Sequence, residues 1–407
     1  MTQYTSRERL LAAIDGPAAA SVPCCFMIFS ALRQQCKDED EFVDRQLELG
    51  LDVRVPVDDL PIRFGAEVEL SEEKEAPAAG GTPLLRRTYR TPAGELTAVV
   101  KQTEDWPYGD RVPLFDDYFT PRALKFPITQ PPDLDALRHL LPEPSAEEIA
   151  TFRERAARRK AFAHERGAAL AGGWKSSRRA QGEDKGLVGE DGGTGTVVDT
   201  LMWLCGGTEP LMWAYDEPEF LSALIGLIED WNRRRLEIQL EIGLDIVIRR
   251  AWYEGTEFWS PALYRQFILP GLKREVELAH QYGARFAYII TSGMMHIAEA
   301  LLEAGIDVII GVDPGEGKGT TLQDTRDVFG GKIALWGGVS GPLTIEEGSE
   351  AQVRQAVEEA MECLAPTGRF ILSPVDNVSA GTEQGWRNLR VFIDTWKALA
   401  GRTGGAA

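Results

Sequence analysis

The sequence predicts an α/β fold, and within that class a single (β/α)8 TIM barrel over residues 1–407 with an inserted hairpin and helical segment at about 70–200. Three observations lead to this prediction. The chain of 407 residues is 43% hydrophobic and 26% charged, which is typical of a globular protein with a sizeable core. From about residue 213 onward, an amphipathic helix followed by a short apolar strand recurs five times, and the same order opens the chain. This alternation indicates parallel βα units.

Near the N-terminus, a helix over 6–15 precedes a strand over 22–29, and a helix over 40–49 precedes a strand over 52–57. We interpret these two steps as the start of the barrel.

The insertion that follows is irregular. Residues 86–101 alternate around the turn Pro92-Ala-Gly94 like a hairpin, and 145–166 reads as a charged helix. The Gly-rich, acidic stretch 182–195 has two interpretations, a mobile loop that tightens on binding or a solvated connector.

The C-terminal half supplies the five further steps. The proline of Ser260-Pro261 suits the first turn of a helix, with the serine as N-cap. The predicted helix and strand of each step are 217–243 with 245–250, 261–282 with 284–290, 295–304 with 307–311, 321–329 with 332–336, and 350–364 with 369–373.

Charge and cysteine content limit the function classes. Lys and Arg total 44 against 63 Asp and Glu, so the net charge of −19 disfavours nucleic acid and anionic membranes as partners. No signal peptide or membrane span is evident, and a cytoplasmic protein is expected. The five cysteines are scattered without CxxC spacing, which favours free thiols over disulfides or a thiolate zinc site.

Several segments together resemble the uroporphyrinogen decarboxylase superfamily. No single segment is specific, but their order and spacing over nearly the whole chain are. They are 6–16 with Val22-Pro23, 49–52, 126–137, 259–264 with Leu269-Pro270, 303–307, 336–339 and 370–374. The resemblance implies a (β/α)8 barrel whose site lies at the C-terminal ends of the strands. It also implies one of two chemistries, namely metal-free decarboxylation of an acidic tetrapyrrole, or zinc- or corrinoid-linked methyl transfer.

Individual residues separate the two branches. Where the methyltransferase branch carries His-x-Cys-Gly, this chain reads Ile290-Thr-Ser-Gly293, and the position of the third zinc ligand falls near Val375 or Asp376. Zinc needs about three protein ligands in a catalytic site, so no metal is expected. The arginine-rich segment of the decarboxylase branch is only partly matched by Leu32-Arg33-Gln34-Gln35. The hairpin and long insertion resemble the methyltransferase-like branch more closely.

Residues that follow the predicted strands form the candidate site. Asp58 or Asp59 falls where the resemblance places a catalytic Asp, and Asp376 where it places a His, so these three are the predicted catalytic residues. The predicted substrate-binding residues are Arg249, Arg250, Trp252, Tyr253, Glu254, Tyr288, Ser292, His296, Asp313, Trp336 and Asn377.

Several of these residues have a structural alternative. The aspartates and Ser292 are also suited to cap helices. Neighbouring residues on a strand point to opposite faces, so at most one of Arg249 and Arg250 faces the pocket, and the other is expected to pair with an acidic residue outside it. One of Trp252 and Tyr253 is equally suited to the core.

Three functions follow from the sequence. The first is methyl transfer from a small methylated compound to a corrinoid (cobalamin), used as a co-substrate and not bound tightly, with a corrinoid protein as partner. The second is decarboxylation of a porphyrinogen-like or smaller acid, and the third is non-catalytic binding of a tetrapyrrole or corrinoid. The oligomeric state is open, with a homodimer as one candidate.

Overall fold

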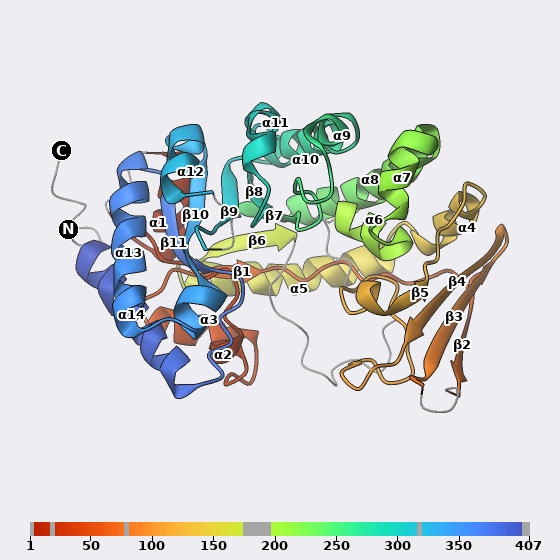
Figure 1. Ribbon diagram of the computed structural model, residues 1–407, viewed down its shortest axis with the longest axis horizontal. Helices are drawn as coiled ribbons and strands as arrows, with labels where there is room; N and C mark the ends of the chain where they lie inside the picture. The colour runs from red at the N-terminus through yellow and green to blue at the C-terminus, as the bar shows by residue number, and fades with distance from the viewer. Residues whose placement is uncertain (1–3, 17–20, 77–80, 174–196, 316–319, 401–407) are drawn as a thin grey trace. The chain divides into compact units, whose positions relative to one another are not determined.

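The computed structural model describes residues 4–16, 21–76, 81–173, 197–315 and 320–400 (Figure 1). The chain divides into two compact units. Unit 1 comprises residues 1–58, 154–178 and 239–407, and unit 2 comprises 59–153 and 179–238. Unit 2 is therefore built from two excursions of the chain out of unit 1. The predicted loop at 182–195 lies outside the described residues.

Unit 1 contains a parallel, curled sheet of seven strands. The strands lie in the order β1 (Arg54–Pro56), β6 (Ala169–Gly173), β7 (Ile246–Arg250), β8 (Arg285–Ile289), β9 (Val308–Val312), β10 (Ala334–Ser340) and β11 (Phe370–Val375). Except for β6, each was predicted from the sequence to within a few residues. The α/β class and the parallel βα order are thus confirmed.

The predicted strand at 22–29 has a different form. It is joined to the sheet through isolated parallel bridges, Cys24 with Leu372 and Ile28 with Asn377. Cys25 N donates to Leu372 O (3.1 Å), and Asp52 N donates to Cys24 O (2.7 Å). The segment 22–28 therefore hydrogen-bonds on one side to β11 and on the other to the residues that lead into β1, without forming a regular strand.

One face of the sheet encloses an apolar interior. Because side chains alternate along a strand, one set from every strand points to the same side. Residues from β6 to β11 and from the segment 22–28 form this cluster, and it also includes Leu10, Leu11, Ala13 and Ile14 of α1 (Ser6–Asp15). The Thr5–Glu8 capping box starts α1, whose apolar face packs against the interior cluster.

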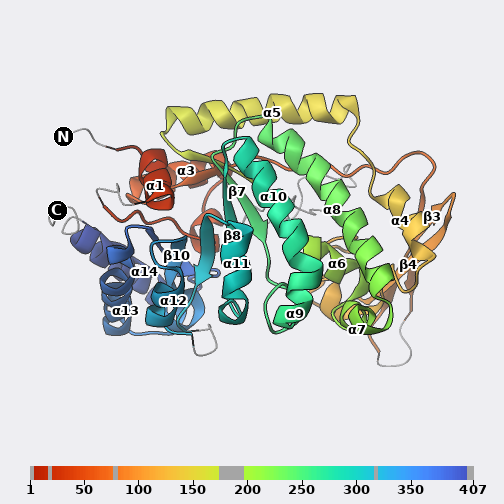
Figure 2. The same ribbon diagram turned by 90° about the horizontal axis from the view of Figure 1, so that it is seen from above.

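Helices cover the opposite face. The helix α10 packs on β8, and α12 and α13 pack on β10, as Figure 2 shows from above. The helical elements of unit 1 that bear on the site are α2 (Ser30–Arg33), α3 (Glu39–Glu48), α9 (Pro261–Leu263), the π-turn Tyr264–Ile268, α10 (Leu269–Gln281), the 3-10 turn Met295–Ile297, α11 (Ala298–Ala304), α12 (Leu322–Phe329), α13 (Glu350–Leu364) and α14 (Glu383–Ala400).

Unit 2 holds an antiparallel sheet in the order β2 (Glu69–Glu75), β3 (Leu84–Thr91), β4 (Gly94–Lys101) and β5 (Ala123–Lys125). The predicted hairpin is confirmed as β3 and β4, and its inner face packs on Trp106, Val112 and Phe119. Other elements are α4 (Asp133–Leu140), α6 (Val197–Cys205), α7 (Glu209–Asp216) and most of α8 (Pro218–Leu240). The charged helix α5 (Ala146–Glu165) runs from unit 2 into unit 1.

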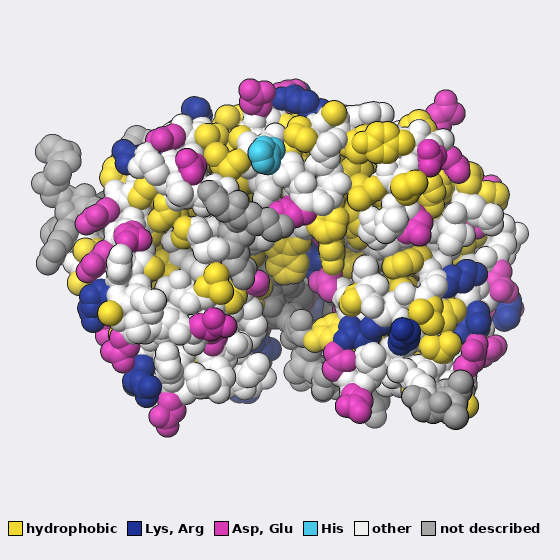
Figure 3. All heavy atoms as spheres, in the orientation of Figure 1, with side chains coloured by type: hydrophobic (Ala, Val, Ile, Leu, Met, Phe, Trp, Pro, Cys, Tyr) yellow, Lys and Arg dark blue, Asp and Glu magenta, His cyan; other side chains and the backbone are white. Residues whose placement is uncertain are grey.

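Two further features concern the hydropathy of the helices and the charge of the surface. No helix within the described ranges is long and apolar enough to cross a membrane. On the face drawn in Figure 3, Asp and Glu side chains are interspersed with Lys and Arg.

Candidate active site

The strand ends of unit 1 carry the polar residues that define the candidate site. Because the seven strands are parallel, their C-terminal ends lie at one edge of the sheet. Asp58 follows β1, Trp252 and Tyr253 follow β7, and Ser292 follows β8. Asp313 follows β9, while Asp376 and Asn377 follow β11. We call this set the strand-end rim.

Close backbone contacts hold one arc of the rim together. Asp313 is buried, and its Oδ1 accepts a hydrogen bond from Gly315 N (2.7 Å). A Cβ at Gly341, just after β10, would lie 2.5 Å from Val375 O, so only glycine fits there. Asn377 Oδ1 accepts from Ser30 N (3.3 Å), which joins β11 to the segment 22–28. A Cβ at Gly315 would lie 3.0 Å from the Cβ of Ser340, so the loop that carries Asp313 lies beside the end of β10, and the ends of β9, β10 and β11 form one arc.

Asp376 has an unusual backbone conformation. Its φ is +64°, in the left-handed region that non-glycine residues rarely adopt. Side chains held there are often found at functional sites, where the surrounding structure maintains the strain. The side chain of Asp376 remains partly exposed at the end of β11.

Arg250 stacks with two aromatic rings. It lies on the same face of β7 as Ile246 and Ile248, which belong to the interior cluster, so Arg250 is the inward member of its pair. Its guanidinium carbon lies 4.4 Å from the ring centroid of Trp252 and 6.0 Å from that of Tyr253. Trp252 is partly buried and packs against the interior cluster, so it contacts both the core and the rim.

Arg249 faces the other way, as the alternation requires. It is 1% exposed and pairs with Glu254 (2.6 Å) and with Glu275 of α10 (2.9 Å). The prediction that one arginine pairs with an acidic residue outside the pocket is confirmed. Burial opposes the charged guanidinium, but Glu254 and Glu275 outweigh it and raise the pKa of Arg249.

Two tyrosines extend this buried network. The Tyr288 hydroxyl donates to Glu254 and lies 3.0 Å from the Tyr264 hydroxyl, and burial raises the pKa of both tyrosines. Tyr288 alternates with Ala287 and Ile289 of the interior cluster, so it points outward. We therefore correct the expectation that Arg249, Glu254 and Tyr288 face the pocket, because the strands separate them from the interior.

The network still bears on the site through the loop after β7. It connects β7, β8 and α10 to Glu254, which lies next to Tyr253 in the sequence. Tyr264 and Glu275 were not predicted from the sequence. Glu275 was detectable as an acidic residue on the buried face of an amphipathic helix.

Trp336 is a core residue. It is fully buried in the interior cluster, and its Nε1 donates to Cys25 O (2.7 Å). The expectation that Trp336 contacts substrate is corrected, because its ring and its only polar atom are both engaged inside the sheet.

The remaining predicted residues are dispersed. Ser292 caps no helix, since Met294 occupies the N-cap position of the following 3-10 turn without a side-chain hydrogen bond. His296 is exposed on that turn and lines a hollow of about 310 Å³ that includes no other predicted site residue. Asp58 belongs to unit 1 and Asp59 to unit 2, where Asp59 favours the charged form of the buried Arg235.

One inward-facing cation was missed by the sequence analysis. Arg54 of β1 pairs in register with Ala169, whose side chain belongs to the interior cluster, so Arg54 shares that inner face. It keeps part of its surface accessible, and burial lowers its pKa. An arginine within the apolar strand 52–57 was the signal available in the sequence.

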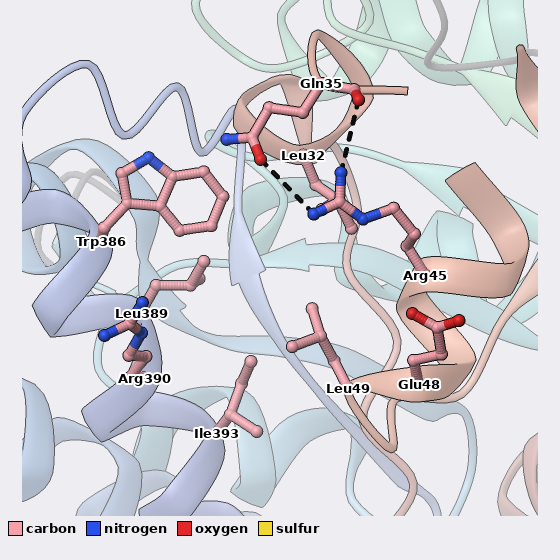
Figure 4. Close-up of a pocket in the computed structure, with 9 residues that line it drawn as sticks. All are labelled: Leu32, Gln35, Arg45, Glu48, Leu49, Trp386, Leu389, Arg390 and Ile393. Carbon is pink, nitrogen blue, oxygen red and sulfur yellow. Dashed lines mark hydrogen bonds between the residues drawn. The ribbon is translucent and has the colours of Figure 1, made fainter. Parts of the chain in front are cut away.

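Two observations concern other kinds of site. Among the described residues, no group of three or more His, Cys, Asp and Glu side chains is arranged to hold a metal ion. A groove of about 460 Å³ lies between α2, α3 and α14, with Leu32, Leu389 and Ile393 among its lining residues and Arg45 hydrogen-bonded to Gln35 at its edge (Figure 4). None of the predicted site residues lines this groove.

The fold and rim define an α/β protein with a polar and aromatic site at the ends of parallel strands. Residues 178–399 match the profile of the family described as Uroporphyrinogen decarboxylase (URO-D). The match covers more than half of the chain, and the protein therefore belongs to the URO-D family. This confirms the resemblance seen in the sequence.

Solved structures agree with the fold. A methyltransferase from Methanosarcina mazei covers 98% of this chain and 99% of its own, with a TM-score of 0.57 and 17% sequence identity. A D-psicose 3-epimerase covers 65% of this chain and 85% of its own at a TM-score of 0.32 and 13% identity, which is too distant to support an argument. No curated protein matches the sequence.

Proposed function

We propose that this URO-D family protein is a methyltransferase that moves a methyl group from a small methylated compound to a corrinoid. The observation that carries the proposal is the charge of the strand-end rim. Asp58, Asp313 and Asp376 follow three of the strands, whereas the inner face of the described strands carries Arg54, Arg250 and Arg285, and Arg285 is already paired with Asp15 of α1. A porphyrinogen with many carboxylates would meet more like charge than opposite charge here, so a small substrate fits better.

Each side chain has a role in this proposal. Asp58 or Asp376 acts as the general acid that protonates the leaving group once the methyl group departs. Trp252 and Tyr253 offer aromatic surface to the substrate or to a planar ring. The rigid loop after β7, held by Glu254, keeps these rings in place.

In this proposal the corrinoid is a co-substrate. It supplies the nucleophile that accepts the methyl group, and we propose that a corrinoid protein delivers it. The name of the Methanosarcina mazei structure, a methyltransferase that covers nearly the whole chain, is in line with this activity.

The proposal also includes a closed barrel. We take the segment 22–28 as the eighth member of a closed (β/α)8 barrel, because it hydrogen-bonds to β11 at one edge and to the entrance of β1 at the other. The chain is then a single barrel domain over 1–407, with unit 2 formed by insertions between its strands.

The test is a methyl-transfer assay on the full chain. Cob(I)alamin is supplied with methanol, methylamines, methyl thiols or methoxy acids, and methylcobalamin formation is followed by absorbance. We expect turnover with at least one donor, and a loss of about 10²- to 10⁴-fold in Asp58→Asn or Asp376→Asn, whichever residue is the acid. Asp394→Asn, at an exposed position of α14, is the control and should be fully active.

Decarboxylation is the second candidate, because the inward arginines provide anchors for a carboxylate. It predicts release of CO2 from a carboxylated substrate without any cobalamin. Such release, with no methyl transfer, would replace the first proposal. Spectral shifts on titration with a corrinoid or tetrapyrrole, with neither reaction, would instead identify a binding protein.

A further inference from the structure

Arg54 lies on the inner face of the sheet. Its register partner Ala169 belongs to the interior cluster, as do Ala171 on the same strand and Cys25 on the segment 22–28. The side chains of these three neighbours are small. Arg54 also lies four residues before Asp58, on the strand that ends at the rim.

The guanidinium of Arg54 has no direct partner within the part of the chain that the structure describes. Its electrostatic neighbours are Cys25 and Glu39, and neither is within ion-pairing distance. This sets Arg54 apart from Arg249, which has two carboxylates, and from Arg250, which stacks on Trp252. A charge taken out of water is costly unless it is paired and hydrogen-bonded. Arg54 is only partly buried, and none of its nitrogens is among the buried atoms that lack a partner, so its guanidinium stays accessible to an anion that pairs with it.

We infer that Arg54 binds the carboxylate of the substrate, so that the methyl donor is a small methylated carboxylic acid. An arginine offers a carboxylate two parallel N–H donors, which fixes the orientation of the ligand as well as its charge. The identity of the ligand as a methyl donor rests on the proposed function. The binding of a carboxylate by Arg54 does not depend on which reaction the protein catalyses.

The experiment measures binding to the full chain by calorimetry, without cobalamin. The probes are acetate, propionate and methoxyacetate, with 2-methoxyethanol as the neutral counterpart of methoxyacetate. We expect at least one carboxylate to bind, methoxyacetate to bind at least tenfold more tightly than 2-methoxyethanol, and Arg54→Met to weaken carboxylate binding at least tenfold. Arg54→Met should fold normally, because the substitution removes no hydrogen bond of the free protein.

Arg9→Met is the matched control. Arg9 donates to Asp52 Oδ1 (2.8 Å), close to the start of the same strand, so this variant perturbs the neighbourhood of β1 without removing the proposed anchor. It should lose stability and keep its affinity for the carboxylates.

Two results would overturn the inference. One is the absence of binding by all three carboxylates at millimolar concentration, and the other is unchanged affinity in Arg54→Met. Binding that depends on Arg54 in a protein that fails the methyl-transfer assay would sustain the anchor and refute the methyltransferase proposal instead.

Discussion

Two buried asparagines differ in whether their side-chain amides are hydrogen-bonded. Asn232 of α8 is 1% exposed, and neither its Oδ1 nor its Nδ2 has a hydrogen-bond partner among the residues described. Asn388 of α14 is equally buried, but its Nδ2 donates to Ile345 O (2.9 Å) and Gly348 O (2.7 Å). The two residues therefore differ in what their amides contribute to folding.

Replacing Asn232 with the similarly sized Leu should raise the free energy of unfolding by about 1 kcal/mol, because an unsatisfied buried amide is removed. Asn388→Leu should lower it by about 1–3 kcal/mol, since two carbonyl oxygens lose their donor. Urea denaturation of both variants measures the difference. Equal destabilisation by the two substitutions would show that Asn232 is hydrogen-bonded in solution.

For single residues, the sequence predicted which side chains lie on opposite faces of a strand, but not which of the two faces is the inner one. Alternation along a strand predicted that Arg249 and Arg250 point to opposite faces, and this is what the structure shows. It did not predict which one faces inward, because a shift of one residue in the register of a strand exchanges its two faces. Trp336 was assigned to the rim because the predicted strand ended at residue 336, whereas β10 continues to Ser340 and places Trp336 in the core.

Among the elements, β7, β8 and α10 are held together by the Arg249 network. Arg249→Met should lower the free energy of unfolding by about 3–5 kcal/mol, because it leaves Glu254 and Glu275 buried without their counter-charge. Arg265→Met, which breaks a half-exposed pair with Glu303, should cost at most about 1 kcal/mol. Chemical denaturation compares the two variants, and similar losses would contradict a special role for the buried network.

The elements of unit 1 were more predictable than those of unit 2. Apolar runs in the C-terminal half identified β7 to β11, since buried parallel strands are continuously hydrophobic. The strand β2, with the sequence Glu69–Glu75, is almost entirely charged and exposed, so hydrophobic periodicity contained no sign of it. The helix α14 was detectable, because Leu389, Phe392 and Trp396 repeat at helical spacing on its buried face.

For the whole molecule, Asp52 links parts of unit 1 that are distant in the sequence. It is fully buried, accepts from Arg9 of α1 (2.8 Å) and from Cys24 N (3.0 Å), and precedes β1. Burial raises the pKa of Asp52 above its ordinary value near 3.8, and Arg9 and Cys24 only partly offset this effect. The folded protein therefore holds this proton more tightly than the unfolded chain does.

This difference gives a pH dependence of defined sign. The contribution of Asp52 to the free energy of unfolding should be largest below about pH 3.8, fall as the pH rises through the folded-state pKa, and stay constant above it. Subtracting the unfolding free energy of Asp52→Asn from that of the natural sequence, at a series of pH values from 4 to 7, isolates this contribution. A difference that grows with pH would show that ion pairing with Arg9 outweighs burial.

The position of α1 bears on the side from which a small molecule reaches the rim. The helix α1 packs against the interior cluster and hydrogen-bonds to Val53, Asp245 and Arg285 at the N-terminal ends of β1, β7 and β8, so it covers the end of the interior opposite the rim. A ligand of the rim therefore enters and leaves on the side of the C-terminal strand ends. In the proposed function, the spent donor therefore leaves on the rim side before the next donor binds there.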